Sequence, residues 1–146
     1  MQLNEEKLKR KELMFSQKQQ QVLLDTVIIP AIQGLRKAGQ AEYAHEKDDA
    51  HANFRRLGEL LDMPQEKILW VYLQKHLDGI NAHINGYTSQ REDVRGRIAD
   101  AMTYLALLWG MVESLNPTAS IIWDDLNANP KAAKEILSKI TEVHND

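Results

Sequence analysis

The longest stretch of unbroken helical periodicity in the chain lies between Glu92 and Glu113. Its apolar side chains recur at i, i+3, i+4, i+7, i+10, i+11 and i+14, a spacing that gathers them on one face of an α-helix. The pattern predicts a core helix whose apolar stripe faces the interior. The stripe consists of Ile98, Ala101, Met102, Leu105, Leu108, Trp109 and Val112.

A second stripe beside the apolar one carries groups that can be charged or form hydrogen bonds. Asp100 lies between two alanines next to the core stripe, where an unpaired carboxylate would be strongly destabilising. We therefore expect Asp100 to meet either a metal ion or a cation such as Arg97 or Lys75. Gly96, inside the same helix, suggests the close approach of another backbone or a ligand. The second stripe consists of Asp93, Arg97, Asp100 and Tyr104.

The remaining pattern is helical as well, with no strand-like alternation and no repeats. Pro30 should kink or interrupt the first helix, and Pro64 suits the start of a later one. Ser89 and Glu92 have the spacing of a capping box. The predicted helices cover residues 4 to about 38, 52–61, 65–84, 92 to about 115, near 118–127 and near 130–142. The apolar stripe of the third is Leu69, Leu73, Leu77, Ile80 and Ile84.

These elements predict an all-α fold, a bundle of about five or six helices in one domain. We divide it into an N-terminal helical segment, residues 1–38, a core, residues 39–115, and C-terminal helices, residues 116–146. Residues 1–20 carry few apolar groups, and such a helix seldom stands alone. It is expected either to pack on a second subunit of a homo-oligomer or to be a solvated, frayed N-terminal segment.

Composition excludes several classes of protein. The chain has 146 residues, 43% apolar and 27% charged, which is ordinary for a globular domain. A net charge of −3 gives no electrostatic reason for nucleic-acid binding. No apolar run approaches the roughly 20 residues that span a bilayer, so no membrane partner is expected. The polar start and the lack of cysteine favour a cytoplasmic protein.

The segment between the first two helices is rich in acids. Glu42 and Glu46 are one turn apart if that segment is helical, and Asp48 and Asp49 follow. Oxygen-rich clusters of this kind bind Mg²⁺ or Mn²⁺. The alternative interpretation is a solvated polar loop, since charge-rich segments are usually exposed. The interleaved His45 and His51 are six apart and lack the helical spacing of a two-histidine zinc site.

A third group joins Lys75 and His76 to Tyr72, one turn earlier on the helix. A lysine facing the same interior as the acids could hold a phosphate. The alternative is a lysine that extends to solvent from the helix edge, beside a core histidine bonded to a neighbour. The chain has no HExxH motif, no glycine-rich phosphate loop and no Gly-x-Ser-x-Gly turn.

Residues 36 to 113 nevertheless resemble a family. The segments AEYAHEKDDAHANFRRLGELL, VYLQKHLDGI and SQREDVRGRIADAMTYLALL are similar to those of small, mostly phage-encoded all-α proteins. More distantly, they resemble nucleotide pyrophosphohydrolases of the MazG type. That resemblance implies Mg²⁺ held by acids of two neighbouring helices, cleavage of nucleoside triphosphates to monophosphate and pyrophosphate, and a dimer or tetramer.

The chain departs from the usual pattern of that family, which is Glu-x-x-Glu on one helix and Glu-x-x-Asp on the next. Glu46 and Asp49 have the second spacing, and Asp100 can stand for the final aspartate. Arginine occupies position 97, where the partner glutamate would be, so Glu92 or Asp93 would have to replace it.

Three hypotheses follow. The first is metal-dependent hydrolysis of a nucleoside triphosphate, with Glu46 and Asp100 as catalytic groups. The second is a protein that binds a nucleotide or nucleotide signal without cleaving it. The third is a helical protein-interaction module. For the first, the metal ligands would be Glu42, Glu46, Asp49, Glu92, Asp93 and Asp100, and the substrate-binding residues Tyr43, Asn53, Lys75, His76, Arg97 and Tyr104, with Trp70 as a further stacking candidate.

Overall fold

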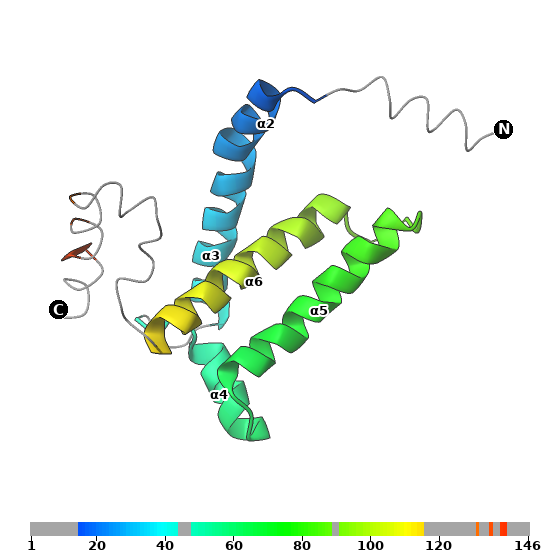
Figure 1. Cartoon of the computed structure of the whole chain (residues 1–146). Helices are drawn as coiled ribbons and strands as arrows, with labels where there is room; N and C mark the ends of the chain where they lie inside the picture. Colours follow the sequence, from blue (N-terminus) through cyan, green and yellow to red (C-terminus); the bar gives the residue numbers. More distant parts are fainter. Residues whose placement is uncertain are drawn as a thin grey trace. The chain divides into compact units, whose positions relative to one another are not determined.

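A computed structural model describes residues 15–43, 48–88 and 91–115 and four further residues, Lys131, Glu135, Ser138 and Lys139. The regular secondary structure within these residues is helical throughout, with no strand (Figure 1), which confirms the all-α prediction. No helix in the described part is both long and apolar enough to span a bilayer.

The chain forms two compact units, Met1–Leu105 and Ala106–Asp146. The predicted helix near 118–127 lies outside the described residues. Of the predicted helix near 130–142, the four described residues are helical, and Glu135 pairs with Lys139 at 3.3 Å. The elements are α2 (Gln17–Leu23), the π-helix η1 (Leu24–Ile28), α3 (Ile29–Tyr43), α4 (Ala52–Leu61), α5 (Gln65–Ile84) and α6 (Val94–Leu115), which continues into the second unit.

Within the described residues the predicted first helix is not continuous, because α2 begins only after Ser16. Ser16 is extended, with φ −72° and ψ 158°, and forms a capping box with Gln19. The Gln19 amide donates to Ser16 Oγ at 3.1 Å, and the Ser16 amide donates to Gln19 Oε1 at 2.8 Å. These bonds satisfy backbone donors that the start of a helix leaves unpaired. An unbroken helix from residue 4 to about 38 was therefore the wrong prediction.

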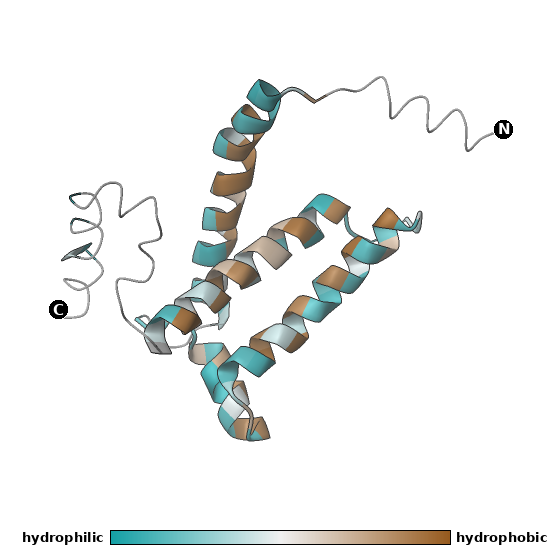
Figure 2. Cartoon of the chain, viewed as in Figure 1, coloured by the Kyte–Doolittle hydropathy of each residue, from teal (hydrophilic) through white to brown (hydrophobic). Residues whose placement is uncertain are grey.

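Pro30 does not end the helix. The π-helical turn η1 precedes it, and the Ile29 amide donates to the Leu24 carbonyl, five residues back. In a regular α-helix the proline ring would press on the carbonyl of Thr26, and the wider turn relieves that contact. Thr26 Oγ1 also donates to the Val22 carbonyl at 2.6 Å. We call the continuous segment Gln17–Tyr43 the arm; it is brown through its middle in Figure 2.

The arm also continues past Gly39, where the sequence predicted its end. A glycine in a helix costs about 1 kcal/mol but does not force the helix to stop. The last carbonyl, that of Tyr43, accepts a hydrogen bond from Arg56 of α4 at 3.3 Å. A donor from a neighbouring helix thus satisfies a group at the helix end.

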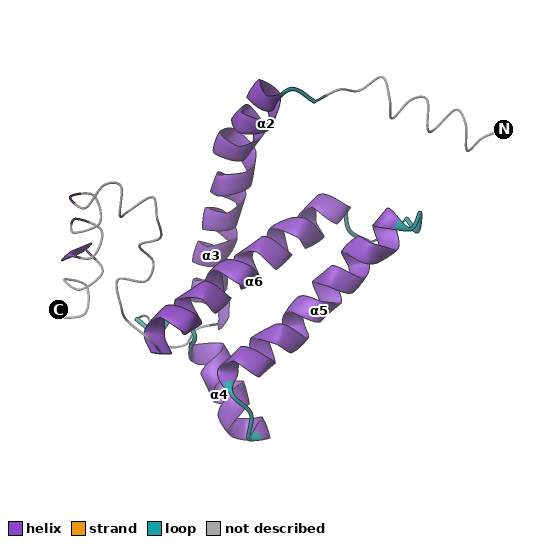
Figure 3. Ribbon diagram, in the orientation of Figure 1, coloured by secondary structure: helices purple, strands orange, loops and turns teal. Residues whose placement is uncertain are grey.

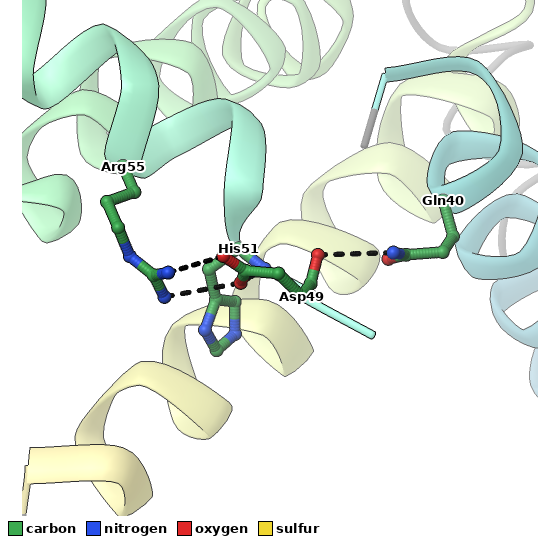
Figure 4. A network of polar contacts seen from close by, with 4 residues as sticks. All are labelled: Gln40, Asp49, His51 and Arg55. Atoms are coloured by element: carbon green, nitrogen blue, oxygen red, sulfur yellow. Dashed lines mark hydrogen bonds and ion pairs between the residues drawn. The ribbon is translucent and has the colours of Figure 1, made fainter. Parts of the chain in front are cut away.

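A polar network joins the end of the arm to the start of α4 (Figure 4). The Asp49 carboxylate forms a two-bond pair with Arg55 and accepts the His51 amide at 3.0 Å. Gln40 donates to the Asp49 carbonyl at 3.1 Å. The network holds the chain where α4 begins at Ala52, as predicted from the sequence.

The turn between α4 and α5 is tight (Figure 3). Asp62 ends α4 with a φ of 52°, and the Met63 amide donates to the Gly58 carbonyl at 2.9 Å. A Cβ atom on Gly58 would lie 2.5 Å from the Met63 carbonyl oxygen, so only glycine fits there without a backbone shift. After Pro64, α5 spans the predicted residues 65–84.

The buried apolar residues only partly match the predicted stripes. In α5, Leu69 and Leu73 are fully buried as expected, whereas Ile84 at the helix end is exposed. In α6, Ala101 is buried, but Ile98, Leu105, Trp109 and Val112 are 40–53% exposed. The buried residues of the described chain are Ala52, Phe54, Gly58, Ile68, Leu69, Leu73, Ala101, Leu107 and Met111.

The inward face of α6 is therefore the stripe of chargeable groups. This stripe runs from Asp93 to Tyr104 in alternating steps of four and three residues. The same steps lead on to Leu107 and Met111, which are both buried. The apolar stripe that the sequence placed in the core is turned partly outward. Periodicity shows that a helix has two distinct faces, but the groups on the neighbouring helix decide which one is covered.

Replacing Gly58 with alanine should destabilise the protein by about 1–3 kcal/mol, because the new methyl group collides with backbone rather than with a movable side chain. Urea unfolding followed by circular dichroism measures the change. Gly39→Ala is the matched control, since nothing lies within 4 Å of its Cβ position; it should be neutral or stabilising by up to about 1 kcal/mol. Equal effects of the two substitutions would contradict a tight turn at Gly58.

Candidate functional site

Helix α5 and the first half of α6 run antiparallel (Figure 1), and their facing residues meet turn by turn. The facing residues of α5 are spaced i, i+4, i+7 and i+11, and those of α6 follow the same spacing in reverse. We call this line of contacts the α5–α6 seam. Its contacts are Tyr72 with Tyr104, His76 with Asp100, and Gly79 with Arg97; the next positions are held by His83 and Asp93, which are both exposed.

Three aromatic rings form one end of the seam. Tyr72 and Tyr104 are stacked, with ring centroids 6.3 Å apart and planes inclined by 14°. The buried Phe54 of α4 meets both edge-on, at 6.1 Å from each. Both arrangements are favoured between aromatic rings at these distances. Tyr72 is 43% exposed, so the cluster extends from the core to the surface.

The carboxylate that the sequence singled out lies at the next turn of the seam. Asp100 Oδ2 is 3.5 Å from His76 Nδ1, and the two side chains are 30% and 16% exposed. The His76 ring also lies 5.3 Å from that of Tyr104. The group that faces Asp100 is thus the imidazole of His76, and among the described residues neither Arg97 nor Lys75 forms an ion pair with it. His76 Nδ1 is buried and has no hydrogen-bond partner among the described residues.

These surroundings affect the ionisation of Tyr104. Burial raises the pKa of its hydroxyl above the ordinary value of 10.0, and the Asp100 carboxylate raises this pKa further. The tyrosines at positions 72 and 43 add smaller contributions in the same direction. Tyr104 is therefore a neutral hydrogen-bonding group across the physiological range, beside a carboxylate that can accept hydrogen bonds.

Arg97 packs directly on Gly79. A Cβ atom at position 79 would lie 2.6 Å from Arg97 Cδ and Nη1, so the glycine makes room for the arginine side chain. Arg97 Nε lies 3.9 Å from Glu92 Oε2, beyond hydrogen-bond distance, and is itself buried. Gly96, where the sequence suggested a close approach, faces only Glu92, 3.1 Å from its Cβ position.

The sequence reasoning missed Gly79 and Phe54. A signal for Gly79 was present, because it belongs to the same stripe as Tyr72, His76 and His83. If that stripe is aligned antiparallel to the second stripe of α6, Gly79 lies opposite Arg97. No comparable signal marks Phe54, which reaches the rings from a separate helix.

The acids proposed as metal ligands are mostly engaged elsewhere. Besides Asp100, three of them pair with arginines: Asp49 with Arg55, Glu92 with Arg97, and Asp93 with Arg95 at 2.9 Å. The Arg95 backbone amide lowers the pKa of the Asp93 carboxyl. This bond, 2.8 Å long, makes Asp93 a cap of α6. Ser89, the first residue of the predicted capping box, lies outside the described residues.

Two of the proposed metal ligands, Glu42 and Glu46, remain to be placed. Glu42 hydrogen-bonds to the adjacent Tyr43 and raises the pKa of that hydroxyl, and Glu46 lies outside the described residues. Within the described part of the chain, no three histidine or acidic side chains gather closely enough to hold a metal ion.

The other candidate substrate-binding residues lie at different distances from the seam. Tyr43 is near enough for its charge to affect Tyr104. Asn53 is partly buried on α4, next to Phe54 in sequence, whereas Lys75 and Trp70 are on the exposed side of α5. The structure thus brings His76, Arg97, Asp100 and Tyr104 onto one surface, with Tyr43 nearby.

No protein-family model matches the chain, and no curated protein or solved structure matches it. The resemblance to phage-encoded and MazG-type proteins remains an expectation from the sequence. The argument for function therefore rests on the α5–α6 seam.

Tyr104→Phe should reduce the loss of stability at alkaline pH. Because the folded-state pKa of Tyr104 is raised, its contribution is fully present below about pH 10 and is lost as the pH rises toward the folded pKa. Melting temperatures of the wild type and the variant, measured from pH 8 to 11, should therefore converge at the alkaline end. Tyr87→Phe, at an exposed position, is the control; parallel curves for wild type and Tyr104→Phe would contradict the burial of this hydroxyl.

Proposed function

We propose that this protein binds a nucleotide, or a signal molecule derived from one, at the α5–α6 seam without cleaving it. The main observation behind this proposal is the order of groups along the seam: the stacked tyrosines, then the His76–Asp100 pair, then Arg97. Aromatic faces, a hydrogen-bonding acid and a cation are the groups that a base, a sugar and a phosphate require.

Each group has a suitable place for this role. The partly exposed Tyr72 offers a ring to the face of a base, and the Asp100 carboxylate can accept a hydrogen bond from an amino or hydroxyl group. Arg97 lies two helical turns from Tyr104, roughly 10 Å along α6. That separation leaves room for a sugar between a stacked base and a phosphate facing the guanidinium, whose planar fork suits phosphate oxygens.

The acids of the described residues do not fit a Mg²⁺ site. Magnesium requires near-octahedral oxygen ligands, usually including one or two carboxylates together with phosphate oxygens. In this fold Asp49, Glu92 and Asp93 face arginines of the same chain, Asp100 faces the His76 imidazole, and these partners lie on three different helices. This arrangement supports binding without a divalent ion over the hydrolysis expected from the MazG-type resemblance.

Calorimetric titration with a panel of nucleoside mono-, di- and triphosphates and cyclic nucleotides tests the proposal. At least one should bind with the same Kd in EDTA and in Mg²⁺ and be recovered intact. Tyr72→Leu should weaken that Kd roughly ten- to hundred-fold, the amount that loss of one base–aromatic stack produces. Val71→Ala, on an exposed position of α5, should leave the affinity unchanged.

Gly79→Ala separates a role in binding from a role in folding. The new methyl group displaces the flexible Arg97 side chain rather than backbone, so stability should change little. Affinity should fall for nucleotides with phosphates, while a free nucleoside should bind as before. Equal losses for nucleoside and nucleotide would show that Arg97 does not face the phosphate.

Two outcomes would overturn the proposal. One is the absence of binding by every nucleotide at millimolar concentration. The other is Mg²⁺-dependent release of pyrophosphate that Asp100→Asn abolishes, which would establish the hydrolase instead.

A further inference from the structure

Asp100 keeps its hydrogen-bonding capacity free in the middle of the α5–α6 seam. Its carboxylate accepts no hydrogen bond from any residue that the structure describes; even His76 Nδ1, 3.5 Å from Oδ2, has no hydrogen-bond partner. The side chain is 30% exposed, so a molecule from solvent can reach it. An ionised carboxylate offers roughly four acceptor positions. Asp100 can therefore accept several hydrogen bonds from a ligand.

The position of Asp100 in the seam matches that of the sugar in a bound nucleotide. Along α6, Asp100 lies roughly 6 Å from Tyr104 and roughly 4.5 Å from Arg97, at 1.5 Å per residue. With the base on the ring of Tyr72 and a phosphate at Arg97, the sugar lies at the height of this carboxylate. The hydroxyl groups of the sugar are thus the donors that Asp100 meets first.

The chemistry of a carboxylate distinguishes ribose from 2′-deoxyribose. Ribose has hydroxyl groups on two adjacent carbon atoms, 2′ and 3′, and the two oxygens of one carboxylate can accept a hydrogen bond from each. Many dinucleotide-binding proteins set an acidic residue against the 2′-hydroxyl in this way. A carboxylate close to a phosphate is otherwise unfavourable, because the two negative charges repel each other. Only a sugar that donates to Asp100 offsets that repulsion.

The neighbours of Asp100 support this use of the carboxylate. The His76 ring covers it on the α5 side and lies 5.3 Å from the Tyr104 ring, so the exposed part is what a ligand reaches. Burial, and then the Asp100 carboxylate, raise the pKa of the Tyr104 hydroxyl. That hydroxyl therefore stays neutral and adds no second negative charge beside a phosphate.

We infer that Asp100 determines the sugar specificity of the α5–α6 seam, selecting ribonucleotides over 2′-deoxyribonucleotides by accepting hydrogen bonds from the 2′- and 3′-hydroxyl groups. The inference rests on the proposed binding of a nucleotide at this seam and adds the class of nucleotide that is bound. His76 is a positioning residue, which acts on the ligand only through the carboxylate beside it.

Calorimetric titration of the full-length chain in EDTA tests the inference without any variant. The probes are the four common ribonucleoside triphosphates, their 2′-deoxy counterparts, and 3′-deoxyATP. A ribonucleotide that binds should have a Kd roughly ten- to hundred-fold lower than its 2′-deoxy counterpart, the effect of one hydrogen bond to a charged group. If ATP binds, 3′-deoxyATP should show a loss of similar size.

Substitution of Asp100 assigns the preference to its carboxylate. Asp100→Ala should weaken binding of the ribonucleotide to the level of the 2′-deoxy compound, which itself should bind no more weakly than to the wild type. Asp100→Asn keeps the shape of the side chain and should reduce the preference, because hydrogen bonds to a neutral acceptor are weaker. Asp78→Ala, at an exposed position of α5, is the matched control and should keep the wild-type preference. Circular dichroism checks that each variant keeps its helices.

Four results would overturn the inference. Equal Kd values for ribo- and deoxyribonucleotides would do so while leaving nucleotide binding intact, and so would equal losses for both sugars in Asp100→Ala. A preference for guanine over hypoxanthine nucleotides that Asp100→Ala removes would show that the carboxylate faces a base instead. Absence of binding by every probe would overturn the proposed function together with the inference.

Discussion

The pairing of Asp100 with His76 is the constraint on which the rest of the α5–α6 arrangement depends. A carboxylate on the covered face of a helix must find a cation or donors, or its burial would strongly oppose folding. In α5 the residue at that height is His76, whose Nδ1 lies 3.5 Å from the Asp100 carboxylate. The neighbouring contacts then follow one turn away on either side: the tyrosine stack on one, and Arg97 over Gly79 on the other.

The same pairing determines what the surface can do chemically. Asp49, Glu92 and Asp93 already face arginines of their own chain and therefore have less capacity to hold a divalent ion. Asp49 illustrates the other use of such a pair, because its contacts with Arg55, His51 and Gln40 join the arm to α4. Within the acidic segment, Asp49 thus has a structural role.

The arm presents the opposite situation, a long helix with apolar groups that are exposed in the described part of the chain. Exposed apolar side chains in a continuous row are characteristic of an interaction surface rather than of a solvated helix. The π-turn before Pro30 matters here, since it lets one helix run through the proline and presents Val22 and Leu35 on a single element.

The sequence by itself determined where most helices lie. Capping residues, prolines and short-range periodicity are local, so Ala52–Leu61 and Gln65–Ile84 were predicted to the residue. It could not determine which face of Val94–Leu115 is covered. A helix with an apolar stripe and a stripe of chargeable groups can bury either stripe, if the neighbouring helix has side chains that complement it. Nor could it identify the group that faces Asp100: the sequence favoured Arg97 or Lys75, whereas the structure places the His76 imidazole there. Those choices belong to the tertiary structure, where the antiparallel register of α5 and α6 brings one histidine to one aspartate and turns the expected core stripe outward.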